Sequence, residues 1–454
     1  MHKLENSALL ERSASIHVAP KPALTLVDAV ALIVGLVIGA GIFETPSLVA
    51  ANTGTIGGVI RVWLIGGIVS LLGALCYAEL ATAYPHIGGN YYYLKRAFGQ
   101  PIAVLFAWAR MTVIQTGSIA LLAFVFGDYA SQLFSFGSYS TSLYAAVAIV
   151  LLTALNIIGL RQSKRLQSGL TVMLILGLLL VILVGLTAPT AVASVAPVAP
   201  STTAPSWGLA LVLVLLSYGG WNEAAYISAE MHNPQRNIVR SLLWSLGIIT
   251  GIYLLINLAF LRGLGVAGTA GSSAVAADLL RRVLGEPGAI FVSVLVVIAT
   301  LGSINATILT GARSSFVLGQ DVSPLRWLAR WHPEPSSPTT AYLLQGAIAL
   351  LLVGLGTFTR KGFETMVDYT APIFWFFFLL STLSLFVLRL REPERVRPFR
   401  VPLYPLVPIA FCAICVYLLY SSLVFTGIGA IAGIIVVLLG LPFVRHTTSS
   451  NNHS

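Results

Sequence analysis

The chain is divided into long, mainly apolar stretches, and this division constrains the fold more than any other feature. A helix needs about 20 mainly apolar residues to cross the core of a bilayer, where the backbone must satisfy its own hydrogen bonds. Twelve segments meet this requirement and predict twelve transmembrane helices in an all-α integral membrane protein. We expect these spans at Thr25 to Ala50, Ile56 to Tyr84, Gln100 to Phe126, Leu143 to Leu160, Leu166 to Leu186, Trp207 to Ala229, Ser241 to Leu261, Ala289 to Leu318, Ala341 to Thr357, Thr365 to Leu388, Leu403 to Val424, and Gly427 to Val444.

The composition excludes an ordinary soluble protein. Apolar residues make up 57% of the chain and charged residues only 9%, whereas about 25% of the residues in a typical soluble domain are charged. The net charge of +10 does not indicate a nucleic-acid partner, because the Lys and Arg residues lie in short gaps between apolar stretches and not on one basic face. The composition therefore favours a polytopic membrane protein.

The distribution of positive charge predicts the orientation, because short cytoplasmic loops of membrane proteins are enriched in Lys and Arg. With the N-terminus on that side, 19 of the 26 basic residues are cytoplasmic, 6 lie on the other side, and Arg110 lies within a span. We therefore expect cytoplasmic termini in a multi-pass protein of the cell membrane, the inner membrane of a bacterium. In one outer loop, residues 275–284 have the pattern of an amphipathic helix, either a lid or a surface helix.

Glycine-rich breaks occupy matching positions in two of the predicted spans. Span one contains the break from Gly35 to Phe43, and span six contains the break from Leu216 to Asn222. Each span is the first of a run of five, and an odd number of spans per repeat places the two repeats in opposite orientations. We expect a tail at 1–24, a first repeat at 25–188, a second repeat at 207–389, two further spans at 402–444, and a tail at 445–454.

Unwound backbone at such breaks would suit a zwitterion. The N-terminus of a half-helix presents unpaired N–H groups that attract a carboxylate, and freed carbonyls attract an ammonium group. An α-amino acid carries both groups and is the expected substrate. Taken alone, Gly35 and Gly39 would also fit close packing of two helices, but the second break at the equivalent position favours a binding site.

Several short motifs occur in a specific order along the chain: Gly39 to Phe43, Tyr77 to Leu80, Gly88 to Tyr93, Tyr218 to Asn222, Glu230 to Pro234 with Arg236 and Asn237, Gly302 to Asn305, and Arg397 to Pro402. Through these motifs nearly the whole chain resembles the amino acid-polyamine-organocation (APC) superfamily of permeases, most closely its L-type amino acid transporter branch. The resemblance implies a five-plus-five inverted-repeat (LeuT-like) fold with spans one and six unwound and two extra C-terminal helices.

The resemblance also implies a substrate site at the two breaks. Its members would be the amides of Gly39, Ala40 and Gly41, the carbonyls of Ile38, Leu216, Ser217 and Gly219, and the side chain of Asn222. Many family members have an aromatic gate where this chain has Leu216, so Tyr218 is a candidate for that ring. Sodium-independent relatives commonly have a Lys where this chain has Leu174.

The coupling ion is left open by these departures. Ser303 and Thr307 in span eight are candidates for a sodium site, together with carbonyls of span one. Alternatively, both hydroxyls bond to the backbone of their own helix.

Charged side chains inside spans are functional candidates because charge at membrane depth costs several kcal/mol unless it is paired or hydrated. Arg110 and Glu223 are candidate pocket groups, which either pair with each other or meet an acidic substrate. Alternatively, Arg110 forms a structural ion pair with Glu79 or Glu223. Glu44 either faces an outer vestibule or points to water.

These observations predict a secondary active transporter, a permease or exchanger, that moves α-amino acids by alternating access, with neutral L-amino acids as the default substrate. A polyamine or organic-cation carrier and an acidic amino acid carrier of the same fold remain alternatives. A non-transporting amino acid sensor is the alternative from another class.

An enzyme is not expected, and neither are a metal site, a cofactor or a nucleic-acid partner. The histidines are scattered, and no G-x-x-x-x-G-K-[ST] motif for ATP hydrolysis is present. The segment between Gly127 and Leu143 contains no Cys. The chain therefore resembles the family members that lack a disulfide-linked partner chain, as a monomer or homo-oligomer in the lipid bilayer.

Overall fold

A computed structural model describes residues 25–39, 41–86, 88–158, 164–190, 206–223, 231, 233–330, 338–424 and 428–448. Over these residues the chain is helical and contains no β-strand. The helices in chain order are α2 (Leu26–Val37), α3 (Gly41–Thr53), α4 (Ile56–Ala83), α5 (Gly89–Phe98), α6 (Gln100–Ala109), η1 (Arg110–Ile114), α7 (Gln115–Leu133), α8 (Ser140–Ile157), α9 (Lys164–Thr187), α10 (Trp207–Ser217), η2 (Trp221–Glu223), α12 (Pro234–Ala270), α13 (Val275–Leu284), α14 (Glu286–Asp321), η4 (Ser323–Ala329), α15 (Thr339–Thr359), α16 (Gly362–Arg391), α17 (Leu406–Val424), α18 (Ile428–Leu438) and α19 (Leu441–Thr448).

Most of the predicted spans coincide with long apolar helices. Within the described ranges, eight helices are long and apolar enough to cross a membrane, and the bent pair α2 and α3 makes a ninth. The predicted spans five, six and twelve fall on shorter apolar helices, at Val172–Thr187, Trp207–Ser217 and Gly429–Val444. The count of eight or nine therefore supports a multi-pass membrane protein, and the count of twelve stays a prediction.

Local sequence signals explain where several helices begin. Thr25 caps α2, because its hydroxyl accepts the amide of Asp28 at 3.3 Å while the Asp28 carboxylate accepts the amide of Thr25 at 3.0 Å. Thr55 caps α4 by accepting the amide of Gly58 at 3.0 Å. These caps fix the entry of the first two spans to within two residues of the predicted positions.

The segment predicted as a span from Gly427 to Val444 contains a turn between α18 and α19, and the span itself stays a prediction. The indole of Trp108 donates to the carbonyl of Val436 at 2.8 Å, a carbonyl that a continuous helix would use for the amide of Gly440. A Cβ on Gly440 would collide with the Trp108 ring. The helix therefore turns where this ring packs against it.

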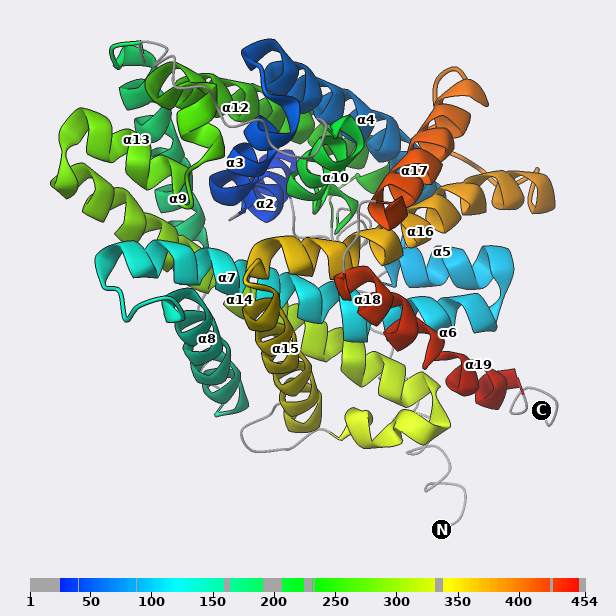
Figure 1. Cartoon of the computed structure of the whole chain (residues 1–454). Coiled ribbons are helices and arrows are strands. Elements are labelled where there is room, and N and C mark those ends of the chain that lie inside the picture. The colour runs from blue at the N-terminus through cyan, green and yellow to red at the C-terminus, as the bar shows by residue number, and fades with distance from the viewer. Residues whose placement is uncertain are drawn as a thin grey trace.

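The two broken helices lie at the centre of the bundle. Figure 1 shows α2, α3 and α10 between α4 and α12 on one side and α7, α14 and α16 on the other. The largest buried apolar cluster surrounds them, whereas large side chains such as Trp244 and Leu351 are 65% and 74% exposed on outward faces. Exposed apolar side chains of this size on many helices fit a surface that faces lipid.

Candidate functional site

The first break separates α2 from α3, which are bent by 51° relative to each other. After Val37, the ψ angle of 83° at Ile38 takes the backbone out of the helix. The amide of Gly39 donates to the carbonyl of Val37 at 2.8 Å. In this conformation the Gly39 amide is thus engaged in a tight turn, while Ala40 lies outside the described residues.

The second break follows α10, which ends at Ser217. A turn over 218–220 leads into the short helix η2, and Gly220 has a φ of 112°, a conformation that side chains rarely adopt. A Cβ at this position would also lie 3.1 Å from the carbonyl oxygen of Leu36. The amide of Gly219 donates to the carbonyl of Leu216 at 3.0 Å. Glycine at 220 therefore lets the second break approach the end of α2.

The structure brings the two breaks into direct contact. A Cβ on Gly41 would lie 3.2 Å from the hydroxyl oxygen of Ser217. That hydroxyl donates to the hydroxyl oxygen of Thr45 at 2.8 Å, which joins α10 to α3. The predicted members of the site from spans one and six are thus neighbours in space, although 172 residues separate Thr45 from Ser217 in the chain.

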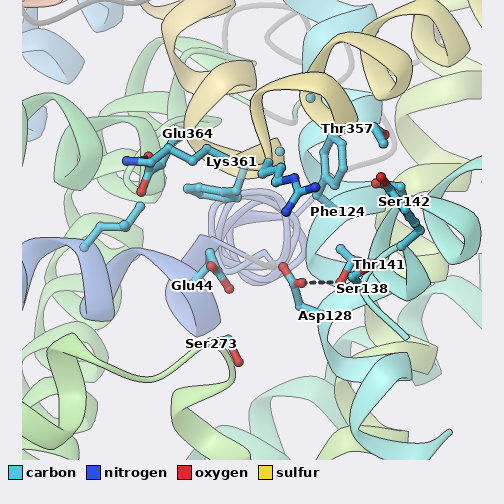
Figure 2. Close-up of a pocket in the computed structure, with 16 residues that line it drawn as sticks. Glu44, Phe124, Asp128, Ser138, Thr141, Ser142, Ser273, Thr357, Lys361 and Glu364 are labelled. Carbon is cyan, nitrogen blue, oxygen red and sulfur yellow. Dashed lines mark hydrogen bonds and ion pairs between the residues drawn. The ribbon is translucent and has the colours of Figure 1, made fainter. Parts of the chain in front are cut away.

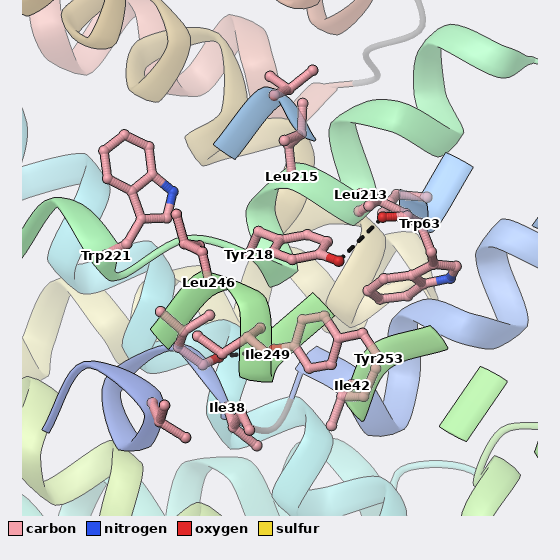
Figure 3. Packing of buried hydrophobic residues seen from close by; sticks show 14 of the residues in the cluster. Ile38, Ile42, Trp63, Leu213, Leu215, Tyr218, Trp221, Leu246, Ile249 and Tyr253 are labelled. Atoms are coloured by element: carbon pink, nitrogen blue, oxygen red, sulfur yellow. Dashed lines mark hydrogen bonds between the residues drawn. The ribbon is translucent and has the colours of Figure 1, made fainter. Parts of the chain in front are cut away.

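Tyr253 of α12 connects the two breaks and was not among the predicted site residues. Its hydroxyl lies 3.0 Å from the carbonyl oxygen of Val37 and 2.9 Å from the carbonyl oxygen of Ser217. The residue is fully buried, and Figure 3 shows its ring beside Tyr218 and Ile249. A buried tyrosine hydroxyl usually has a hydrogen-bond partner, but the same span also contains Ser241, Ser245 and Thr250, so the sequence did not single out Tyr253.

Arg110 and Glu223 pair with each other at the edge of the second break. The pair is bidentate: the two terminal guanidinium nitrogens of Arg110 each lie 3.2 Å from one carboxylate oxygen of Glu223. Arg110 begins the π-helical turn η1, which interrupts span three, and Asn222 donates to the same carboxylate at 3.3 Å. The carbonyl oxygen of the Asn222 side chain accepts the amide of Gly220 at 3.3 Å. Asn222 therefore links the backbone of the break to the ion pair.

Glu79, the other partner considered for Arg110, lies in a different cluster. Its carboxylate is 1% exposed and accepts two hydrogen bonds from Arg389, at 2.7 and 2.5 Å. It also accepts the amide of Val401 at 2.7 Å, and Arg397 lies 3.6 Å away. The alternative of an Arg110 to Glu79 pair is therefore wrong, because a carboxylate so occupied has no place for a further cation.

Of the remaining candidates, Tyr218 lies in the turn of the second break and packs on Tyr253 with ring centroids 5.0 Å apart, whereas Ser303 and Thr307 lie in α14. Tyr218 is fully buried and donates to the carbonyl of Trp63 at 3.1 Å, so its ring faces α4 (Figure 3). In α14 the hydroxyls of Ser303 and Thr307 donate to the carbonyls of Ala299 and Ser303, at 3.2 and 2.9 Å. The two hydroxyls thus bond to the backbone of their own helix, which is the alternative to a sodium site that the sequence left open.

A cavity of about 280 Å³ lies near the first break but does not coincide with it. Glu44 lines it, three residues beyond Gly41 and therefore about 4.5 Å further along α3. Figure 2 shows Glu44 and Asp128 turned toward this space. Of the two interpretations of Glu44, the structure thus supports a vestibule.

Known proteins match the chain over most of its length. The family described as "Amino acid permease" matches residues 24–451. The chain is 30% identical over 407 residues to "b(0,+)-type amino acid transporter 1" of Mus musculus, which covers 88% of this chain and 82% of that protein. It is also 30% identical over 438 residues to "Large neutral amino acids transporter small subunit 2" of Mus musculus, which covers 94% of this chain and 81% of that protein. The chain therefore belongs to the amino acid permease family, within the APC superfamily.

Proposed function

We propose that the chain is a secondary active transporter, a permease or exchanger, for α-amino acids, with neutral L-amino acids as its substrates. Membership of the amino acid permease family supports amino acid transport. We further propose twelve spans in two inverted repeats, 25–188 and 207–389, followed by two spans at 402–444. In this arrangement both termini lie on the cytoplasmic side of a bacterial inner membrane.

The contact between the two helix breaks carries the proposal. A Cβ on Gly41 would lie 3.2 Å from the Ser217 hydroxyl, a Cβ on Gly220 would lie 3.1 Å from the Leu36 carbonyl, and Tyr253 bridges the carbonyls of Val37 and Ser217. Backbone groups of both spans therefore converge on one volume. A carbonyl oxygen has two lone pairs. The Val37 oxygen already accepts both the Tyr253 hydroxyl and the Gly39 amide, whereas at the Ser217 oxygen the bond from Tyr253 leaves room for a second donor. The ammonium group of an amino acid is such a donor.

The amides at the start of α3 would take the substrate carboxylate. The N-terminal end of a helix carries a partial positive charge, and its first amides lack partners within the helix. Gly39, Ala40 and Gly41 lie at this end. The tight turn at Gly39 would open as the carboxylate enters, and movement of one repeat against the other would then expose the site to the opposite side.

The ion pairs favour neutral substrates over the alternatives. The cationic group of Arg110 is paired with Glu223, so an acidic substrate would have to displace that carboxylate. A polyamine would require several pocket carboxylates, but Glu79 is held by Arg389 and Glu223 by Arg110. A neutral amino acid needs neither group.

One relative is named a small subunit. In this chain the segment between Gly127 and Leu143 contains no cysteine. We therefore propose that no partner chain is linked through a disulfide there and that the chain acts alone or as a homo-oligomer.

Transport by the purified full chain in liposomes tests the function. Radiolabelled L-leucine, L-glutamate, L-lysine and putrescine would be offered under imposed sodium gradients, imposed proton gradients, or with unlabelled substrate inside. We expect leucine uptake in at least one arm. Absence of amino acid uptake in all arms would contradict the proposal, and saturable binding of leucine without flux would favour a sensor.

A further inference from the structure

The cavity next to α3 is bounded by helix ends that the predicted orientation places on the outer face. It lies between the start of α3, the end of α7, the first turn of α8, and the connection from α15 to α16. Its volume of about 280 Å³ is near the lower end of the range of ligand pockets, about 300–1,000 Å³. A molecule of the size of a single amino acid fits this volume.

One wall of the cavity carries two carboxylates. Glu44 comes from α3 and Asp128 from α7, and Figure 2 shows both turned toward the space. The Oε2 atom of Glu44 is buried and has no hydrogen-bond partner among the described residues. Asp128 accepts a hydrogen bond from the Thr141 hydroxyl at 2.8 Å. A buried carboxylate oxygen without a donor is costly, so this wall is suited to a ligand that supplies one.

A cationic group lines the same cavity from the connection before α16. Lys361 pairs with Glu364 at 3.0 Å, whereas Arg360 makes no ion pair with any residue in the described part of the chain. The guanidinium of Arg360 is therefore available to an anionic group. Among the described residues, the cavity thus combines two carboxylates without a cationic partner, Glu44 and Asp128, with one guanidinium without an anionic partner, Arg360.

A zwitterion matches this combination better than an ion of one sign. A simple cation would leave Arg360 unused, and a simple anion would be repelled by Glu44 and Asp128. We propose that the outer cavity is a second binding site for an α-amino acid, with its ammonium group held by Glu44 and Asp128 and its carboxylate by Arg360. This inference rests on the proposed function, because the same substrate would occupy it on the way to the helix breaks.

A buried aromatic pair lies between this cavity and the first break. Phe43 and Tyr129 pack edge to face with ring centroids 5.9 Å apart, and the Tyr129 hydroxyl donates to the Phe43 carbonyl at 3.3 Å. The same hydroxyl oxygen accepts the amide of Ala276 in α13 at 3.3 Å. A ligand in the cavity would be separated from the breaks by this pair.

The test is the number of leucine molecules bound per protein. Equilibrium binding of radiolabelled L-leucine to the purified full chain would be compared with binding to the double variant Glu44→Gln/Asp128→Asn. We expect the double variant to bind one equivalent fewer, whether the wild type binds two equivalents or one. The comparison therefore does not depend on binding at the helix breaks. An equal number of equivalents in the two proteins would overturn the inference.

Matched controls separate the site from general charge effects. Glu394→Gln removes one exposed carboxylate from the connection after α16 and should leave the number of equivalents unchanged. Arg360→Gln should weaken the affected site about tenfold, as expected for the loss of one charge-assisted contact. The substitutions Glu44→Gln and Asp128→Asn keep the shape of the side chain and remove its charge. Gel filtration and thermal unfolding of each variant would show that folding is retained.

Two truncated ligands test the claim that both ends of the amino acid are recognised. 3-Methylbutylamine lacks the carboxylate of leucine, and 4-methylpentanoate lacks its ammonium group. Neither should displace leucine from the Glu44-dependent equivalent at concentrations where unlabelled leucine does. Displacement by the amine as efficiently as by leucine would show a plain cation site and would overturn the assignment to a zwitterion.

Discussion

At the scale of single residues, Gly41 decides whether the two breaks can share one site. A Cβ at this position would already lie 3.2 Å from the Ser217 hydroxyl and 3.7 Å from the Ser217 Cα. The two methyl groups of valine would fill the space between the breaks, and such overpacking costs about 1–3 kcal/mol. We expect Gly41→Val to lower leucine uptake in liposomes about tenfold or more.

The control for this substitution is Gly247→Val in α12. A Cβ on Gly247 meets no atom within 4 Å, and the residue lies on an exposed face of the helix. Uptake by this variant should stay close to that of the wild type. Normal uptake by Gly41→Val at equal protein level would remove the first break from the substrate site.

Tyr253 permits a second prediction at this scale. Tyr253→Phe removes the hydroxyl that serves the carbonyls of Val37 and Ser217 and leaves two buried acceptors with one donor fewer. We expect the free energy of unfolding to fall by about 1–2 kcal/mol. Tyr144→Phe is the matched control, because the Tyr144 hydroxyl donates to the Phe134 carbonyl at an exposed site. An equal loss of stability in the two variants would contradict a special role for Tyr253.

The sequence could identify the positions of the breaks at the site, but not which side chains pair with which groups. The glycines at 39, 41 and 220 identify breaks because glycine permits such backbone locally. Tyr253 carries no comparable local signal, since its role depends on carbonyls 216 and 36 residues away. The partner of Arg110 was likewise open between Glu79 and Glu223, because the choice depends on how helices pack and not on sequence spacing.

At the scale of elements, Glu79 joins three segments of the chain. It lies in α4, while Arg389 lies in the last turn of α16 and Val401 precedes α17. Removing one partner of a buried ion pair costs about 3–5 kcal/mol, because the other charge stays buried without compensation. We expect Glu79→Gln to lower the free energy of unfolding by about this amount, measured by chemical denaturation in detergent.

Glu392→Gln is the matched control on the same side of the bundle. Glu392 pairs with Arg96 at 2.6 Å, but the two side chains are 25% and 37% exposed, so we expect the free energy of unfolding to fall by less than about 1 kcal/mol.

The hydrogen bond from Arg96 lowers the pKa of Glu392. The stabilisation is therefore present at neutral pH and is lost as the pH falls through that lowered pKa. A similar loss of unfolding free energy in Glu79→Gln and Glu392→Gln would contradict the stronger, buried ion pair proposed for Glu79.

Most element boundaries followed from the sequence, and the exceptions have identifiable causes. The amphipathic pattern predicts residues 275–284, and α13 spans Val275–Leu284. The π-helical turn at Arg110 and the interruption before Leu441 were not predicted. Both depend on side chains from other helices, Glu223 and Trp108, which apolar periodicity does not report.

At the scale of the whole molecule, the orientation in the membrane can be tested with single cysteines. The three native cysteines would be replaced by alanine. Ser138→Cys would then place a thiol in the exposed connection between α7 and α8, and Glu394→Cys would place one in the exposed connection after α16. The excess of basic residues predicts that these two connections lie on opposite sides of the membrane, with the second one inside. In intact cells, a membrane-impermeant maleimide should therefore label the cysteine at 138 and should label the cysteine at 394 only after the cells are opened.

The reverse pattern would invert the proposed orientation, and labelling of both sites in intact cells would place both connections on the same side. The outer cavity includes Ser138, and the ion-pair cluster of Glu79 with Arg389 and Arg397 lies near Glu394. The labelling pattern therefore also tests whether the cavity faces the medium and this cluster faces the cytoplasm.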